Sequence, residues 1–355
     1  MPPPPTEIRL TLDPRGRFDV IDVPARIQAE LGDALARHRG ALYCSPHTTA
    51  GYLEQRFASR LRDHRERLSL FFKAFGAVFP PEAAYEHDKM HLRAELSDEQ
   101  RAVEPRNGDS HLTFIGTGMS NCVTYRNREA SPVYFIDLDG INQGTRRQRR
   151  TSVVGYDHEA VVERFRVGVP TSRHPIDAIN LGDPRLGLFE TIDESLAAAG
   201  IEKGRVDIAL EPSERNVGLT VNEYETLLMQ HDLREVLQNP FKFAAQKGRH
   251  MLDDPLAIPG KTINYARYDV VRVLNLLIEA FGVQESVVER LIAKMMAAPA
   301  RRFLRTRRIS FLASDHAREG RSRVVRGTYQ SPILVQWQAP EALSRALEIS
   351  LVRLS

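Results

Sequence analysis

The sequence predicts an α+β protein made of two tandem mixed-sheet domains. Its 355 residues exceed the usual size of a single domain. One order of elements also occurs twice: an apolar segment, an amphipathic helix, a glycine, a short strand and a polar motif that ends in glycine. An apolar fraction of 42% and a charged fraction of 27% are ordinary for a globular protein, and no apolar run approaches the roughly 20 residues that span a bilayer.

The N-terminal arm, residues 1–16, starts with MPPPP. Its prolines favour an extended polyproline conformation, and it lacks the positive flank and apolar core of a secretory signal. We therefore expect a cytoplasmic protein without membrane contact. Cys44 and Cys122 have no CxxC spacing, which argues against a disulfide framework and a cysteine-built zinc site and favours buried, inert thiols.

The first copy is predicted over residues 17–155 and opens with RFDVIDVP, residues 17–24. ALYC, residues 41–44, is expected to be a short strand after a glycine. Apolar residues recur at helical spacing before this strand, and again after the motif SPHTTAG. They are Ile27, Leu31, Ala34 and Leu35 in the first stretch and Leu53, Phe57 and Leu61 in the second.

The second copy is predicted over residues 160–355, and the seam lies near residues 151–163. RFRVGVP, residues 164–170, echoes RFDVIDVP, and the helical stretch that follows ends at Gly200 in a capping role. RVDIAL, residues 205–210, alternates apolar and polar residues as a strand does. The order of elements therefore repeats.

Two further motif pairs support the duplication. EPSERNVG corresponds to SPHTTAG, so that Gly218 matches Gly51. GTYQSPILVQ, from Gly327, aligns without gaps on GTGMSNCVTY, from Gly116. The copies differ in their middles, because the second has an inserted pair of amphipathic helices at about residues 266–298.

The motifs of the first copy resemble a known family. HTTAG, YEHDKMHL (residues 85–92), GTG and DLDG (residues 137–140) with the arginines that follow are similar to the pattern of the YjbQ-like family, often called secondary thiamine-phosphate synthases. The resemblance covers most of residues 17–155. It implies small mixed α+β domains that associate as homo-oligomers with their sites close to subunit contacts.

The second half resembles the same family with different losses. It keeps Glu223 and Asp232 in VGLTVNEYETLLMQHDL and Gln330 in GTYQ. In the predicted register, Glu214 lies where the first copy has His47, while Arg56 and Met119 replace the glutamate and the glutamine. The first copy thus keeps the histidines and the second keeps the carboxylates and the glutamine. This pattern predicts a composite site, with one degenerate structural copy beside one altered active copy as the alternative.

Three histidines are the predicted metal ligands. His87 and His91 are spaced i, i+4, which puts both rings on one face if the segment is helical, and His47 is a candidate third ligand. Zinc is the natural divalent ion for imidazole ligands, and it would polarise an oxygen or lower the pKa of bound water. The alternative without metal uses His47 as a general acid or base, with Asp63 or Asp88 orienting a ring.

An anion-binding role is expected for the hydroxyls and arginines around these motifs. Thr48 and Thr49 would donate hydroxyl hydrogen bonds to a phosphate. Thr48 is the predicted catalytic residue of the two, and Thr49 is predicted to bind the substrate. Arg146, Arg147 and Arg149 would close on the same anion. Glu223 and Gln330 would contact the ligand if the composite site exists, whereas Asp139 fits an Asp-Gly turn better than catalysis.

These observations predict an enzyme that acts on a phosphorylated or otherwise anionic small molecule. A net charge of +3 fits an anionic ligand without demanding nucleic acid. A transferase similar to thiamine-phosphate synthases and a metal-dependent hydrolase both remain open, as does a non-catalytic scaffold that binds a ligand or a metal. Nucleic-acid binding would rest on RRFLRTRR, residues 301–308, which lacks interleaved aromatics and a reading motif, so it is disfavoured.

Overall fold

The computed structural model describes residues 4–61, 63–93, 96–127, 131–174, 176–223, 232, 235–237, 243, 304–315 and 323–355. The chain divides into two compact units. The first unit contains Met1–Gln55, Met119–Tyr224 and Arg305–Ser355, and the second contains Arg56–Gly118 and Glu225–Leu304. The first unit therefore takes sheet segments from both predicted copies, and the predicted copy boundaries stay a prediction.

Two antiparallel sheets in the first unit come from the first copy. The larger has the order β1 (Thr6–Leu12), β9 (Arg149–Tyr156), β3 (Gly40–Cys44) and β5 (Cys122–Arg126). The smaller has the order β2 (Asp19–Asp22), β6 (Tyr134–Asp137) and β4 (Ala50–Gly51). A two-stranded ribbon, β7 (Ile141–Asn142) and β8 (Thr145–Arg146), precedes β9.

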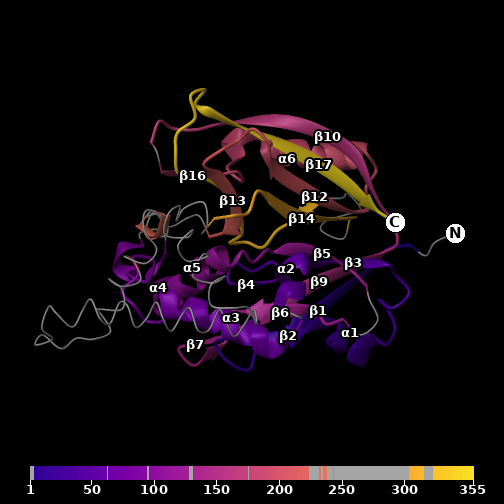
Figure 1. Ribbon diagram of the computed structural model, residues 1–355, viewed down its shortest axis with the longest axis horizontal. Coiled ribbons are helices and arrows are strands. Elements are labelled where there is room, and N and C mark those ends of the chain that lie inside the picture. The colour runs from indigo at the N-terminus through magenta and orange to yellow at the C-terminus, as the bar shows by residue number, and fades with distance from the viewer. Residues whose placement is uncertain are drawn as a thin grey trace, which may run out of the picture. The chain divides into compact units, whose positions relative to one another are not determined.

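Two sheets from the second copy repeat this topology. The larger has the order β10 (Glu159–Pro170), β17 (Ser344–Leu354), β12 (Lys203–Leu210), β14 (Arg308–Ser314) and β15 (Arg323–Val325). The smaller has the order β11 (Asp177–Asn180), β16 (Ser331–Gln336) and β13 (Val217–Asn222). Apart from β15, each strand has a counterpart in the first copy, and β10 and β17 run side by side as an antiparallel pair (Figure 1). The predicted α+β fold with a tandem repeat of sheets is confirmed, but every strand pair in the described residues is antiparallel, so the sheets are not of the predicted mixed kind.

In each copy, one helix follows the first strand of the smaller sheet. α1 (Val23–Leu31) follows β2, and α6 (Leu188–Ala198) follows β11. α1 is capped by Asp22, whose side chain accepts a hydrogen bond from the Ala25 amide. It ends at Gly32, which has a φ of +61°, so it is shorter than the predicted stretch to Leu35. α6 comes directly after η3 (Pro184–Leu186) and ends before Gly200, as predicted.

The cores follow from strand alternation. Val206, Ile208 and Leu210 of the predicted strand RVDIAL lie in β12 and pack with α6 and β17 in one apolar cluster. A second cluster joins the larger sheets of the two copies. It consists of Leu42, Cys44, Cys122, Val154, Tyr156, Leu312, Val352 and Leu354.

Part of the predicted N-terminal arm is a strand, while residues 1–3 of its proline run lie outside the described residues. Residues 6–12 form β1, which pairs with β9 along its whole length. Ile8, Leu10 and Leu12 are buried, and this period of two gives the segment a sheet face to bury. In the part of the chain described, no helix is both long and apolar enough to cross a bilayer.

Strand pairing corrects two of the sequence alignments. β10 contains RFRVGVP, but it occupies the place of β1, and β11 is the counterpart of β2. The segment GTGMSNCVTY leads into β5, whereas GTYQSPILVQ leads into β16, whose counterpart is β6. Local similarity misled both alignments because a strand is identified by its hydrogen-bonded neighbours, not by its own residues. Met119 is therefore not the counterpart of Gln330.

The second unit is helical where it is described. It contains most of α2 (Gln55–Ala58), η1 (Ser59–Leu61), α3 (Arg65–Val78), η2 (Met90–Leu92), α4 (Asp98–Val103) and α5 (Gly108–Thr117). Phe71 of α3 packs against the rings of Phe57 and Phe75, with centroids 5.3 and 5.2 Å away. All ten residues of α5 are buried. The predicted helical pair at about residues 266–298 and the helical stretch from Tyr224 lie outside the described residues.

Candidate functional site

A buried arginine organises the loop that carries PHTTAG. Arg149 opens β9, and its Nε and Nη2 donate to the two carboxylate oxygens of Asp137 at 2.8 Å each. Nη2 also donates to the Asp139 carbonyl at 2.9 Å and to the Thr49 hydroxyl at 3.3 Å. Arg149 is 3% exposed and Asp137 is fully buried, so the pair is a desolvated, bidentate ion pair.

His47 lies next to this pair as a neutral imidazole. Its Nε2 accepts a hydrogen bond of 2.9 Å from the Arg150 amide, and because an amide can only donate, the ring proton must be on Nδ1. Burial, followed by the charges of Arg149, Arg150 and Arg147, lowers the pKa of His47 to about 3. At neutral pH, His47 is therefore a hydrogen-bond donor through Nδ1 and carries no charge.

The second copy donates hydrogen bonds to the backbone of the same loop. Gln330, which precedes β16, donates from Nε2 to the Ser45 carbonyl at 2.8 Å and to the His47 carbonyl at 3.1 Å. Asn121 donates to the same two carbonyls. A Cβ on Gly327 would lie 1.8 Å from the Pro46 carbonyl oxygen, so only glycine fits there. Gln330 thus reaches the His47 backbone and not its imidazole.

The predicted anion-binding residues differ in exposure. Thr48 is half-buried and Thr49 is buried against Arg149. Arg146 in β8 is exposed, while Arg147 is half-buried and its Nε lies 3.2 Å from Asp139 Oδ2. Asp139 thus joins the arginine cluster as well as making the predicted bend before Gly140.

The remaining predicted residues are divided between the units. Glu223 is buried directly after β13 in the first unit, and Asp63 lies in the second unit with a φ of +51°. His87 and His91 also lie in the second unit, whereas His47 lies in the first. The segment of the two histidines consists of turns and the short η2, so the helical premise for their pairing does not hold. His87 is fully buried and His91 is exposed.

A second histidine pair, which the sequence analysis missed, lies within the second unit. The rings of His87 and His111 have centroids 4.8 Å apart, and His111 is 1% exposed in α5. His87 Nδ1 donates to Asp88 Oδ1 at 2.9 Å, because a carboxylate oxygen accepts, and in the neutral ring this leaves the lone pair on Nε2. The same oxygen accepts from the Asn107 and Gly108 amides at 3.0 Å, which ties the His87 turn to the start of α5.

A signal for His111 was present in the sequence. The dipeptide His-Leu of the family pattern occurs at residues 91–92 and again at residues 111–112. Only the second lies on a buried helix beside His87. A Cβ on Gly108 would lie 2.9 Å from Tyr85 Cβ and 3.2 Å from His87 Cβ, so the glycine of the preceding NGDSHL segment permits this close approach.

The second copy repeats the arginine centre with different partners. Asp137 and Gln336 occupy matching places, because Asp137 lies opposite Asp19 and Ala50 while Gln336 lies opposite Asp177 and Val217. This register places Glu214 where the first copy has His47, as predicted. Glu214 Oε1 accepts from the Ala346 amide at 2.7 Å, and its Oε2 accepts from Arg345 Nη1 at 2.8 Å.

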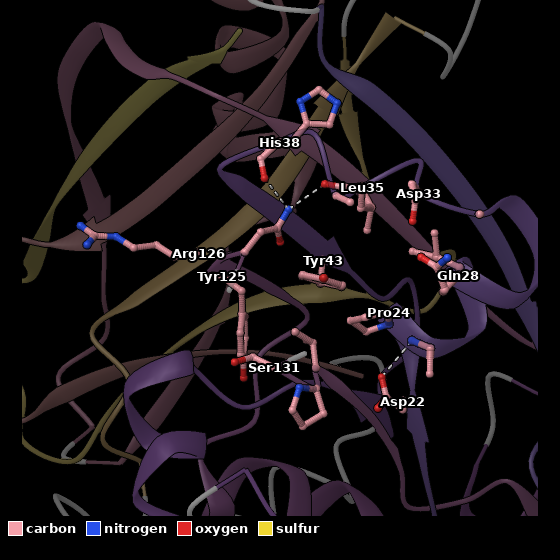
Figure 2. Close-up of a pocket in the computed structure, with 17 residues that line it drawn as sticks. Asp22, Pro24, Gln28, Asp33, Leu35, His38, Tyr43, Tyr125, Arg126 and Ser131 are labelled. Carbon is pink, nitrogen blue, oxygen red and sulfur yellow. Dashed lines mark hydrogen bonds between the residues drawn. The ribbon is translucent and has the colours of Figure 1, made fainter. Parts of the chain in front are cut away.

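A cavity of about 640 Å³ lies elsewhere in the first unit. Its wall is formed by α1, the residues after it, β3 and the end of β5. Figure 2 shows Tyr43 between Asp22 and His38, and burial raises the pKa of both Asp22 and Tyr43. The residues that line this cavity include none of the site residues predicted from the sequence.

Comparisons with solved structures find likenesses over about half of the chain. The chain is similar to a YbjQ-like protein of unknown function from Sulfolobus solfataricus P2, with 15% identity and a TM-score of 0.28, covering 55% of this chain and 99% of that chain. It is similar to a hypothetical protein from Aeropyrum pernix K1, with 13% identity and a TM-score of 0.26, covering 53% and 97%. It is also similar to an uncharacterised YjbQ-family protein from Clostridium acetobutylicum, with 12% identity and a TM-score of 0.27, covering 53% and 98%.

These names agree with the predicted resemblance to the YjbQ-like family. TM-scores this low assign no role to any residue. Neither a family model nor a curated protein matches the chain.

Proposed function

We propose that this protein is an enzyme that binds a phosphorylated or otherwise anionic small molecule beside the PHTTAG loop. The observation that supports this most is the neutral His47 among arginines. Burial, and after it the charges of Arg149, Arg150 and Arg147, lowers its pKa to about 3, so part of the shift comes from a positive field. A field that opposes a proton on the ring favours an anion near it.

The individual groups suit that ligand. Arg149 is engaged by Asp137, so the arginines that remain to meet an anion are the exposed Arg150 and Arg146, together with the half-buried Arg147, which would share its guanidinium with Asp139. His47 would add a neutral N–H donor from Nδ1, and Thr48 would add a hydroxyl. A neutral imidazole that polarises an oxygen is a known catalytic device, so His47 fits an electrophilic role better than that of a base.

Calorimetric titration with inorganic phosphate and with pyrophosphate tests the binding step. Arg147→Ala and Arg150→Ala are each expected to weaken binding about tenfold, because each removes a charge-assisted contact. Arg150→Ala keeps the amide that holds His47. Arg164→Ala, an exposed arginine on β10, is the matched control and is expected to leave affinity unchanged. Equal affinity in all four proteins contradicts the placement of the site.

Turnover distinguishes the enzyme from the scaffold. Phosphorylated metabolites would be incubated with the protein and followed by mass spectrometry. Loss of a retained metabolite, abolished in His47→Ala, supports a transferase or a hydrolase. Retention without conversion supports the non-catalytic alternative.

A separate metal-dependent activity in the second unit is a second candidate, favoured by the pair of His87 and His111. Two imidazoles, one of them oriented by Asp88, form a donor set that zinc accepts. A bound zinc would supply a Lewis acid or lower the pKa of a bound water. Glu223 and Gln330 remain proposed ligand contacts.

Elemental analysis of protein purified without a metal-affinity tag tests this candidate. We expect stoichiometric zinc that His111→Ala removes. Retention of zinc in His91→Ala would assign the site to His87 and His111, and its loss would support the ligand set predicted from the sequence. Protein without stoichiometric metal rules out the metal-dependent activity.

A further inference from the structure

We infer that Cys44 and Cys122 are a modification site at which an intramolecular disulfide forms. The two sulfur atoms lie 2.8 Å apart, compared with about 2.05 Å for a disulfide bond. Both residues belong to the first unit, and they are directly opposite each other on the antiparallel strands β3 and β5. This inference is independent of the proposed function.

The register puts the pair where cross-strand side chains come closest. The Ser45 amide donates to the Asn121 carbonyl at 2.7 Å, and the Asn127 amide donates to the Arg39 carbonyl at 2.9 Å. Hydrogen-bonded pairs alternate along an antiparallel ladder, so these bonds at the two ends make Cys44 and Cys122 a non-hydrogen-bonded pair. Such pairs have Cα atoms about 4.5 Å apart, which is within the range of about 4.4–6.8 Å that a disulfide spans.

The surroundings favour this pairing over other products. Both sulfurs lie in the apolar cluster between the larger sheets, with exposures of 9% for Cys44 and 5% for Cys122. The chain has two cysteines, so each can form an intramolecular bond only with the other. Burial, together with the neighbouring Cys44, raises the pKa of the Cys122 thiol, so thiolate formation there is disfavoured.

The chemistry balances with a small-molecule disulfide as the oxidant. The Cys44 thiolate attacks one sulfur of that disulfide, forms a mixed disulfide and expels one thiolate. The Cys122 thiolate then attacks the Cys44 sulfur and expels the second. Two protein thiols are oxidised to one disulfide, the small disulfide is reduced to two thiols, and the two protein protons pass to the leaving thiolates. We expect slow formation, because both sulfurs are buried.

The bond would fix the strand ends under the PHTTAG loop. Cys44 directly precedes Ser45, Pro46 and His47. Cys122 directly follows Asn121, whose amide donates to the Ser45 and His47 carbonyls. Oxidation would therefore link covalently the two backbone segments that hold the loop.

Incubation of the native full chain with glutathione disulfide tests the inference. The protein would be quenched in acid, unfolded in denaturant and alkylated without reductant. We expect neither cysteine to be alkylated, a mass lower by two hydrogen atoms and a peptide cross-linked through Cys44 and Cys122. The denaturation midpoint should rise and should return to its starting value on reduction.

Variants make the result specific. Cys44→Ala and Cys122→Ser should each leave one thiol, give no cross-linked peptide and show no rise in midpoint with oxidant. If the wild-type chain is alkylated at both cysteines at every glutathione ratio, the inference is wrong. A glutathione adduct that does not resolve, or a disulfide between two chains, would overturn it equally. These outcomes are read on the wild-type protein, so they do not depend on a variant that folds.

Discussion

Each copy buries one arginine, and the two copies differ in where the carboxylate that balances its charge is located. In the first copy the charge of Arg149 is balanced by Asp137, which lies on strand β6. In the second copy Arg345 is balanced by Glu214, which lies on the loop before β13, while the matching strand position is the neutral Gln336. Each buried arginine thus has one carboxylate, and only the position of that carboxylate has changed.

This exchange explains why a histidine can occupy position 47. His47 and Glu214 each accept the amide of the residue that follows the buried arginine, namely Arg150 or Ala346. Because Asp137 already supplies the negative charge, the loop position of the first copy needs only a neutral acceptor, which an imidazole provides. The second copy needs a carboxylate there, so it cannot offer an imidazole.

The copies also differ in uncompensated positive charge. The residue after the buried arginine is the exposed Arg150 in the first copy and Ala346 in the second. The exposed Arg146 extends the cationic surface only in the first copy, and Arg147 beside it is paired with Asp139. We therefore propose that the anion binds to the first copy. The second copy contributes Gln330, which holds the backbone of the PHTTAG loop.

The largest expected effect comes from breaking the charge balance. Asp137→Gln leaves a buried guanidinium without its carboxylate and should cost about 3–5 kcal/mol of unfolding free energy. Adding His47→Glu transplants the arrangement of the second copy and should restore part of the loss. Urea denaturation measures both. Asp183→Asn, at an exposed ion pair with Arg185, is the control and should leave the unfolding free energy nearly unchanged. A double variant that is no more stable than Asp137→Gln would refute the equivalence of the two centres.

A smaller effect should appear as the pH falls. The folded pKa of His47, about 3, lies below the unfolded value of about 6.5, so between these values the unfolded chain binds the extra proton. The penalty is absent above about pH 6.5 and grows as the pH falls, to about 2–3 kcal/mol near pH 4.5. His47→Gln keeps an acceptor for the Arg150 amide and should show correspondingly less loss of stability between about pH 7 and pH 4.5. Parallel pH profiles for both proteins would contradict the depressed pKa.

The smallest effect concerns the contact that joins the copies. Gln330→Ala leaves Asn121 as the side-chain donor to the Ser45 and His47 carbonyls and should cost about 1–2 kcal/mol of unfolding free energy. Hydrogen exchange should rise at residues 45–51. Gln148→Ala, at an exposed position, is the control and should change neither quantity. Unaltered exchange in Gln330→Ala would show that the first copy holds its loop alone.

The sequence predicted those elements whose signals are local. A short apolar run after a glycine predicted β3, alternation predicted β12, apolar spacing predicted α1 and α6, and Gly200 marked the end of α6. The match of His47 with Glu214 also followed from the sequence, because the motif glycines Gly51 and Gly218 fix the same register. The metal ligands, the substrate contacts and the reaction stay predictions.

The pairing of the strands could not be read in the same way. RFRVGVP resembles RFDVIDVP closely, yet β10 is the counterpart of β1, because hydrogen bonds to β17 decide its place. His111 was overlooked because its neighbour His87 lies 24 residues earlier and is brought to it by the turn at Asp88. Such contacts depend on chain reversals that no local pattern records.

The sequence by itself determined the repeated elements, the retained histidines and the arginine cluster, because periodicity and motif chemistry are properties of neighbouring residues. Only the tertiary structure decided that Asp137 balances Arg149, that burial beside arginines keeps His47 neutral, and that Gln330 of the second copy donates to the backbone of the first-copy loop. The reason is physical. The charge balance of a buried group is set by desolvation and by partners distant in the chain, and these exist only once the sheets have paired.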